Sequence, residues 1–206
     1  MRLKEVNYAI GNWMVGVGVK ALRFMGDGNN HLIVRGNTDF PDRAIIAANH
    51  VGYSDSALLA RALREQDRRI YFLSKRKLML LPFTGNRTFL SPSGKIRTEN
   101  IRDMRGALER EYMIGIFPEG TISRVNGVVG QIGEIGDGVF KLSRILGAPI
   151  VPAAINHGTN ERLPFESDDI VINFGEVFPY KMDDKGTDPA SLLRIELQDL
   201  HDAVHR

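Results

Sequence analysis

The fold of this chain is decided by residues 44–55, AIIAANHVGYSD, in which an apolar run is followed by a histidine and, five residues later, an aspartate. In a continuous helix the side chains of His50 and Asp55 would lie roughly 140° apart, and in a continuous strand about 16 Å apart. They can meet only if the chain turns between them, and Gly52 permits such a turn. The stretch therefore predicts a buried strand, a turn and then a helix.

A turn of this kind would give His50 and Asp55 a chemical role. A carboxylate that accepts the Nδ1–H of a histidine fixes its tautomer, and Nε2 can then act as a general base near neutral pH. The N-terminus of the following helix would help to keep Asp55 ionised. A buried histidine beside a helix-capping aspartate would show the same spacing, so the H-x4-D pattern alone leaves both interpretations open.

Short apolar runs alternate with helical patterns along the rest of the chain. Strands are predicted at 32–35, 44–48, 70–74, 113–117, 149–155 and 170–174. Helices are predicted at 54–66, with Ser54 as N-cap, at 98–111, at 134–147, ending at Gly147, and from Asp188 or Ser191 to about 204. This alternation predicts an α/β fold with a mostly parallel central sheet flanked by helices.

Length and composition indicate one ordinary globular domain. The chain has 206 residues, of which 43% are hydrophobic and 25% charged, and this size suits a single core. We assign that domain to residues 29–206. There is no cysteine, which excludes disulfides and thiolate metal sites.

Residues 1–28 are predicted to form an amphipathic helix. Apolar side chains, Trp13 among them, recur near one helical stripe between residues 6 and 24. Charged residues interrupt the stretch, so it falls short of the roughly 20 apolar residues of a membrane-spanning helix, and no cleavage site of a signal peptide follows it. The helix would lie at a membrane interface or pack on the domain core.

Charge is distributed unevenly along the chain. Residues 61–110 hold 13 Lys and Arg against 5 Asp and Glu, whereas residues 151–206 hold 5 against 11. Within the basic region, residues 75–83 place three cations beside an apolar cluster. This region is a solvated face, or it meets an anionic partner such as phospholipid headgroups or an acidic carrier protein. Nucleic acid is disfavoured, because the aromatic residues are few and not interleaved with the basic ones.

A second motif, FPEGT at residues 117–121, follows the apolar run 113–116. Gly120 would let a ligand approach the backbone closely and Thr121 would add a hydroxyl donor, while Glu119 would accept from a hydroxyl or brace an arginine. A simple strand-ending turn is the alternative. Like His50, this motif comes directly after a strand, where ligands bind in a parallel sheet.

Taken in order, Asn49-His50 with Asp55, the 117–121 motif and residues 151–155 resemble the glycerolipid acyltransferase family, most of all the bacterial 1-acyl-glycerol-3-phosphate (lysophosphatidate) acyltransferases. The resemblance covers roughly residues 30–180. It implies transfer of a fatty acyl group from acyl-CoA or acyl carrier protein to the free hydroxyl of lysophosphatidate, giving phosphatidate in phospholipid biosynthesis. It also implies catalysis by His50 and Asp55 without metal or cofactor, in a peripheral protein on the cytoplasmic face of an anionic membrane.

The same resemblance places Glu119, Gly120 and Thr121 at the glycerol-phosphate end of the acceptor. The family's motif usually continues with Arg-Ser. Here Ile122 replaces that arginine and Arg124 follows two residues later, so Arg124 is a further candidate ligand.

The family's second motif usually has an arginine soon after a Phe-containing strand, and here the corresponding basic residues are displaced downstream. Arg97 is our preferred substitute as phosphate ligand, with Arg87 and Lys95 behind it. Acylation of another lyso-lipid or amino-lipid hydroxyl therefore stays open, as does a lipid-binding protein without transfer activity. Among the other histidines, which lack metal-ligand spacing, His157 follows a strand end and could border the site.

Overall fold

A seven-stranded sheet runs through the part of the chain that the computed structural model describes, residues 32–52, 55–74, 88–90, 96–122, 131–157, 169–179 and 188–203. The strands are β1 (Leu32–Gly36), β2 (Ile45–Ala48), β3 (Arg69–Ser74), β4 (Thr88–Leu90), β5 (Tyr112–Ile116), β6 (Ile150–Asn156) and β7 (Ile170–Phe174). The helices described are α2 (Asp55–Arg64), α3 (Thr98–Leu108), α4 (Gly138–Leu146) and α5 (Pro189–Asp202).

The strand order is β1-β7-β6-β2-β5-β3-β4. Every neighbouring pair is parallel except β6 and β7, which are antiparallel. The predicted α/β fold with a mostly parallel sheet is therefore confirmed. Strand β2 lies at the centre between β6 and β5, so the carboxyl ends of these three strands meet at one edge of the sheet, which is where open α/β sheets bind ligands.

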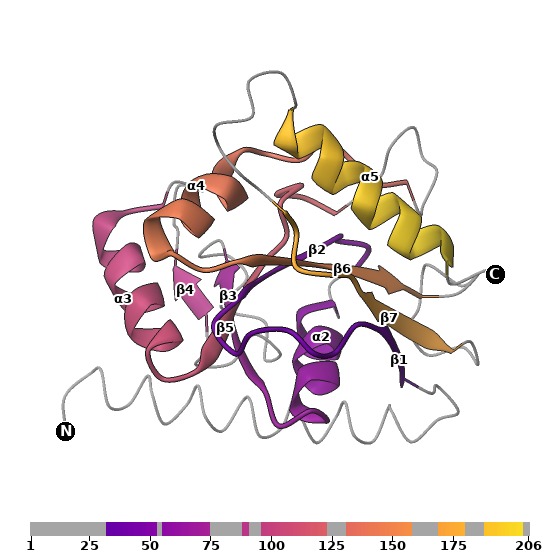
Figure 1. Ribbon diagram of the computed structural model, residues 1–206, viewed down its shortest axis with the longest axis horizontal. Helices are drawn as coiled ribbons and strands as arrows, with labels where there is room; N and C mark the ends of the chain where they lie inside the picture. The colour runs from indigo at the N-terminus through magenta and orange to yellow at the C-terminus, as the bar shows by residue number, and fades with distance from the viewer. Residues whose placement is uncertain are drawn as a thin grey trace.

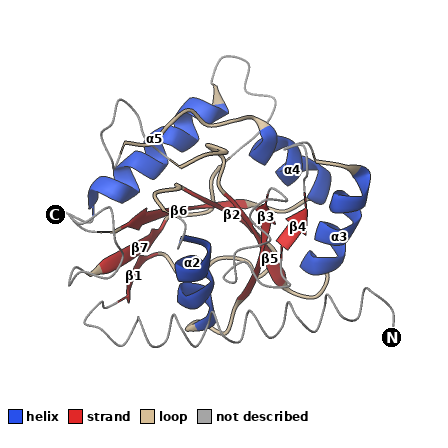
Figure 2. Cartoon of the chain, turned by 180° about the vertical axis from the view of Figure 1, so that it is seen from behind, coloured by secondary structure: helices blue, strands red, loops and turns tan. Residues whose placement is uncertain are grey.

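Helices cover both faces of the sheet (Figures 1 and 2). Side chains alternate across a strand, so Ile45 packs with α3, α4 and α5 on one face, whereas Ile46 packs with α2 on the other. The four residues of β2 are fully buried. The turn from β2 into α2 must therefore carry the chain from the middle of the sheet to one of its faces.

All six predicted strands are present, with ends that differ by one residue at most. Strand β4 was not predicted, because three residues are too few to show a period. The predicted helix 134–147 begins only at Gly138. Its expected first turn is a loop, in which the backbone N–H of Gly136 donates to the carbonyl of Pro118. Just before this loop, the backbone N–H groups of Ile132 and Gly133 donate to the side chains of Gln198 and Glu119.

The other three predicted helices are shorter than expected, and their ends are set locally. Helix α5 begins after Asp188, whose carboxylate accepts from the backbone N–H groups of Ala190 and Ser191. Gly147 ends α4 with φ 63°, as predicted. The expected helix over residues 1–28, the N-cap Ser54 and the segment 75–83 lie outside the described residues. Among the described helices, none has the length and apolarity that crossing a membrane requires.

Candidate active site

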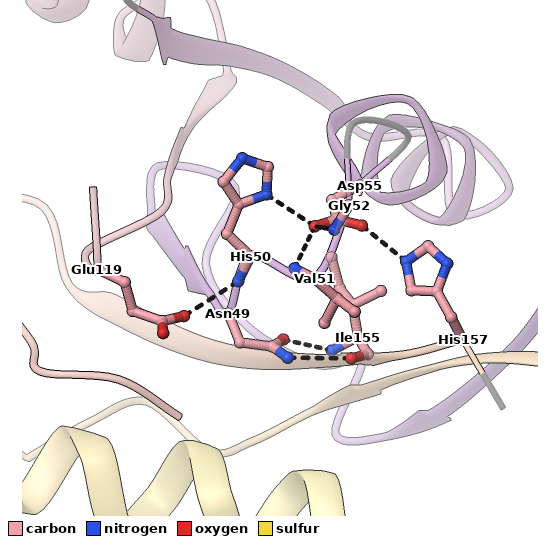
Figure 3. Close-up of polar contacts among 8 residues, drawn as sticks. All are labelled: Asn49, His50, Val51, Gly52, Asp55, Glu119, Ile155 and His157. Carbon is pink, nitrogen blue, oxygen red and sulfur yellow. Dashed lines mark hydrogen bonds and ion pairs between the residues drawn. The ribbon is translucent and has the colours of Figure 1, made fainter. Parts of the chain in front are cut away.

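His50 and Asp55 meet at the carboxyl end of β2, as their spacing predicted. Nδ1 of His50 lies 2.8 Å from Oδ2 of Asp55, which is the first residue of α2 (Figure 3). The chain turns between them at Gly52, whose carbonyl accepts from the Asp55 backbone N–H at 3.3 Å. This turn brings together two side chains that neither a helix nor a strand would have joined.

The Asp55 side chain is fully buried and accepts four hydrogen bonds. Besides His50, the backbone N–H groups of Val51 and Gly52 donate to Oδ2 at 2.7 and 2.8 Å. Burial would raise the pKa of Asp55, but the hydrogen bonds from His157, His50 and the backbone outweigh it and hold the pKa below its ordinary value. Because an ionised carboxylate can only accept, Nδ1 of His50 carries a proton and Nε2 of a neutral ring does not.

The fourth donor comes from the end of a different strand. Nε2 of His157 lies 2.7 Å from Oδ1 of Asp55, and the His157 side chain is only 6% exposed. The sequence indicated only that His157 follows a strand and could border the site. The missing information was the strand order, which places the end of β6 beside the end of β2.

The His50 ring is held on its flat side by aromatic side chains. It stacks on Phe117 with ring centroids 4.3 Å apart and an interplanar angle of 18°, and Phe117 in turn stacks on Phe72 at 5.9 Å and 6°. The His50 side chain is 16% exposed, and Figure 3 shows its second ring nitrogen on the side away from Asp55. The ring is thus fixed in place, and Nε2 faces away from the groups that fix it.

Glu119 joins the 117–121 motif to the backbone of this site. Its Oε1 accepts from the backbone N–H of His50 at 3.1 Å, and its Oε2 accepts from the backbone N–H of Gly133 at 2.7 Å. A Cβ at position 133 would lie 2.7 Å from the same Oε2, so a glycine is needed there for this approach. The two motifs predicted from sequence therefore lie side by side.

Gly120 and Thr121 lie at the exposed end of this turn. Gly120 has φ 69°, and its backbone N–H donates to the carbonyl of Phe117 at 3.0 Å. A Cβ built at Gly120 would meet no atom within 4 Å, so the turn is open on that side. Contact of these residues with an acceptor stays a prediction.

Of the basic candidates, only Arg97 lies within the described residues. It is exposed at the start of α3, and its guanidinium lies 3.6 Å from the carboxylate of Glu99. Arg87, Lys95 and Arg124 lie outside the described residues. Phosphate binding by any of the four stays a prediction.

Comparison with known proteins agrees with this arrangement. The model of a family described as Acyltransferase matches residues 31–156, which is more than half of the chain. The chain belongs to the acyltransferase family. It is therefore an enzyme of acyl transfer, as the motifs predicted. The matched range runs from just before β1 to the last residue of β6, so it includes His50, Asp55 and Glu119 and stops one residue before His157.

A solved acyltransferase shares the fold of this one. It is the 1-acyl-sn-glycerophosphate (LPA) acyltransferase PlsC from Thermotoga maritima, which is 16% identical, with a TM-score of 0.58. The match covers 100% of this chain and 84% of the other. No curated protein matches the sequence.

The site offers one clear chemical capability, which is proton transfer. The pair His50–Asp55 can take up a proton at Nε2 of His50 and stabilise the imidazolium that results. Within the described ranges, no group of three or more His, Asp or Glu side chains is arranged to hold a metal ion.

Proposed function

We propose that this acyltransferase moves a fatty acyl group from a thioester, acyl-CoA or acyl carrier protein, to the free hydroxyl of 1-acyl-glycerol-3-phosphate, giving phosphatidate. The family supports acyl transfer. The order and spacing of its motifs and the fold shared with a lysophosphatidate acyltransferase favour this acceptor. The observation that carries the proposal is the 2.8 Å contact between Nδ1 of His50 and Oδ2 of Asp55.

In this mechanism Nε2 of His50 takes the proton of the acceptor hydroxyl while the oxygen attacks the thioester carbonyl. The tetrahedral intermediate collapses, the C–S bond breaks, and the leaving thiolate takes the proton back from the imidazolium. Asp55 keeps the ring in the tautomer that this step needs and stabilises its charged form. No acyl-enzyme forms, so no nucleophilic serine or cysteine is required.

His50→Ala and His50→Gln test the proposal. Removal of a general base lowers turnover by about 10²–10⁴-fold. The melting temperature should fall less in His50→Gln than in His50→Ala, because glutamine keeps a polar side chain beside the buried Asp55 carboxylate. Purified protein is assayed with both thioester donors and a panel of labelled lyso-lipids. Full activity in both variants would refute the role of His50. Activity on another lyso-lipid or an amino-lipid, but not on lysophosphatidate, would replace the acceptor and keep the chemistry.

We further propose that the enzyme works as a peripheral protein on the cytoplasmic face of the membrane. The amphipathic pattern of residues 1–28 and the basic region 61–110 support this, since apolar burial and attraction to anionic lipid add in such binding. A variant lacking residues 1–28 should float less with anionic vesicles than the full chain and keep its melting transition. Loss of that transition would instead place residues 1–28 in the domain core.

A further inference from the structure

Asp55 is held by two histidines, and the proposed mechanism uses only one of them. His50 contacts Oδ2, whereas His157 contacts Oδ1 at 2.7 Å (Figure 3). His157 is nearly as buried as Asp55, with side-chain exposures of 6% and 0%. The Nε2 of His157 is engaged by the buried carboxylate, so this nitrogen cannot act on a substrate while the contact holds.

The position of His157 is fixed by the neighbouring strand. Strands β2 and β6 pair in register up to Ala48 and Ala153. Beyond that pair, the side chain of Asn49 forms two hydrogen bonds with the backbone of Ile155. His50 follows directly after Asn49, and His157 comes two residues after Ile155. The two histidines are therefore carried by segments that are bound to each other.

We propose that His157 is a positioning residue for the acyl transfer, which donates its Nε2–H to Oδ1 of Asp55 and so holds the carboxylate in the plane that His50 requires. This inference rests on the proposed role of His50 as base. With Oδ1 bound by His157 and Oδ2 bound by His50, Val51 and Gly52, rotation of the carboxylate would break hydrogen bonds on both oxygens. The base is then oriented through a chain of three side chains, His157–Asp55–His50.

Loss of the His157 donor should also change how the pair takes up protons. A buried carboxylate with one donor fewer is less stable as an anion, so the pKa of Asp55 rises. Two other ionisable groups lie near these residues. Glu119, which follows β5, accepts from the backbone N–H of His50. On α5, Nε2 of His201 lies 3.4 Å from Nδ2 of Asn156, the residue before His157. Both groups are still present when residue 157 is replaced.

The experiment compares His157→Gln, which keeps an N–H donor at similar reach, with His157→Met, which has similar bulk and no donor. For each we measure kcat and the KM for the acceptor between pH 5 and 9. A hydrogen bond to a charged group is strong enough that its loss should lower kcat about 10- to 100-fold in the Met variant. The acceptor KM should stay within about threefold, because this loss acts on the chemical step. In the Met variant the acid limb of the kcat profile should also move to higher pH. The Gln variant should recover most of the lost kcat and most of this shift.

An equal loss of kcat in the Gln and Met variants, with an unshifted acid limb, would overturn the proposal and leave His157 a packing residue. A wild-type kcat in the Met variant would overturn it as well. If the Met variant does not fold, His157→Asn, which is polar but too short to reach Oδ1, takes its place in the comparison. His50→Ala separates the two proposals. If that variant is inactive while His157→Met is fully active, only the role of His157 fails. If His50→Ala is fully active, the proposed mechanism fails as well.

Discussion

Asn49 binds the backbone of Ile155 as another strand residue would. Its Nδ2 donates to the Ile155 carbonyl at 3.0 Å, and its Oδ1 accepts from the Ile155 N–H at 2.6 Å. Asn49 is 1% exposed and Ile155 is fully buried. The side-chain amide thus continues the parallel pairing of β2 and β6 beyond the point where β2 leaves the sheet to carry His50 into the site.

Asn49→Ala should therefore reduce both stability and activity. The variant leaves a buried N–H and a buried carbonyl of Ile155 without these partners, at a cost of about 1–3 kcal/mol for each group. Unfolding by urea measures the stability loss, and kcat should fall because the ends of β2 and β6 separate. Asn37→Ala is the matched control, since both hydrogen bonds given for the Asn37 amide lie at the surface, one to Glu176 and one from the backbone N–H of Asp39. Equal stability of the two variants would contradict the role of Asn49.

Glu119→Gln tests whether Glu119 braces the site or binds the acceptor. An amide keeps one acceptor oxygen and turns an NH₂ group toward the backbone N–H of either His50 or Gly133, so one of the two contacts is lost. We expect a stability loss of about 1–3 kcal/mol together with a lower kcat. The control is Glu176→Gln, whose carboxylate accepts from Asn37 at the surface. An increase in acceptor KM at unchanged stability would instead support contact with the acceptor.

Sequence reasoning succeeded where a single segment contains the whole signal. The apolar run 44–48 predicted β2, and the spacing of His50 and Asp55 around Gly52 predicted their contact. Each motif comes directly after a predicted strand, which predicted that both would lie at one edge of the sheet. The contact of Glu119 with the His50 backbone confirms this.

Sequence reasoning failed where a contact depends on which strands are neighbours in the sheet. His157 reaches Asp55 because β6 lies beside β2, and alternating strands and helices fix no such order. The same holds for Gly133, which lies just before the predicted helix 134–147 and whose backbone N–H donates to Glu119. Local patterns thus indicated the pair His50 and Asp55, whereas the side chains that hold this pair, His157 and Phe117, come from distant parts of the chain.

Asp55 should also make stability depend on pH. Its pKa in the folded chain is below the ordinary value of 3.8, so on acidification the unfolded chain binds the proton first. The resulting stabilisation is complete above about pH 5 and is lost as pH falls through the folded pKa. Urea unfolding of the wild type and of Asp55→Asn between pH 6 and 2.5 measures this effect. The excess in the free energy of unfolding of the wild type over Asp55→Asn should shrink below that pH.

Asp188→Asn is the control for this series. Hydrogen bonds from Ser191 and the backbone of Ala190 also lower the pKa of Asp188, but its carboxylate is fully exposed. Its pH-dependent contribution should therefore be smaller than that of Asp55. A gap between wild type and Asp55→Asn that stays constant across the whole range would show that Asp55 is not held as an anion in the folded chain.

The last prediction concerns Gly115, which leaves room for the aromatic stack behind His50. Gly115 pairs with Phe72 across β5 and β3, and a Cβ at Gly115 would lie 2.4 Å from two carbons of the Phe72 ring. Gly115→Ala must displace this buried ring, on which Phe117 stacks, and Phe117 in turn stacks on His50. We expect a stability loss of about 1–3 kcal/mol from overpacking and a lower kcat.

Gly106→Ala is the matched control for that variant. Gly106 lies within α3, where an added Cβ would meet nothing within 4 Å, so alanine should stabilise the chain by up to about 1 kcal/mol through helix propensity. Adding Phe72→Leu to Gly115→Ala should recover part of the stability, because the smaller side chain leaves space for the new methyl group. If kcat in the double variant stays low while stability returns, the stacked ring itself is needed to hold His50. If Gly115→Ala alone matches the wild type in both measurements, the backbone absorbs the methyl group and the stack does not depend on this glycine.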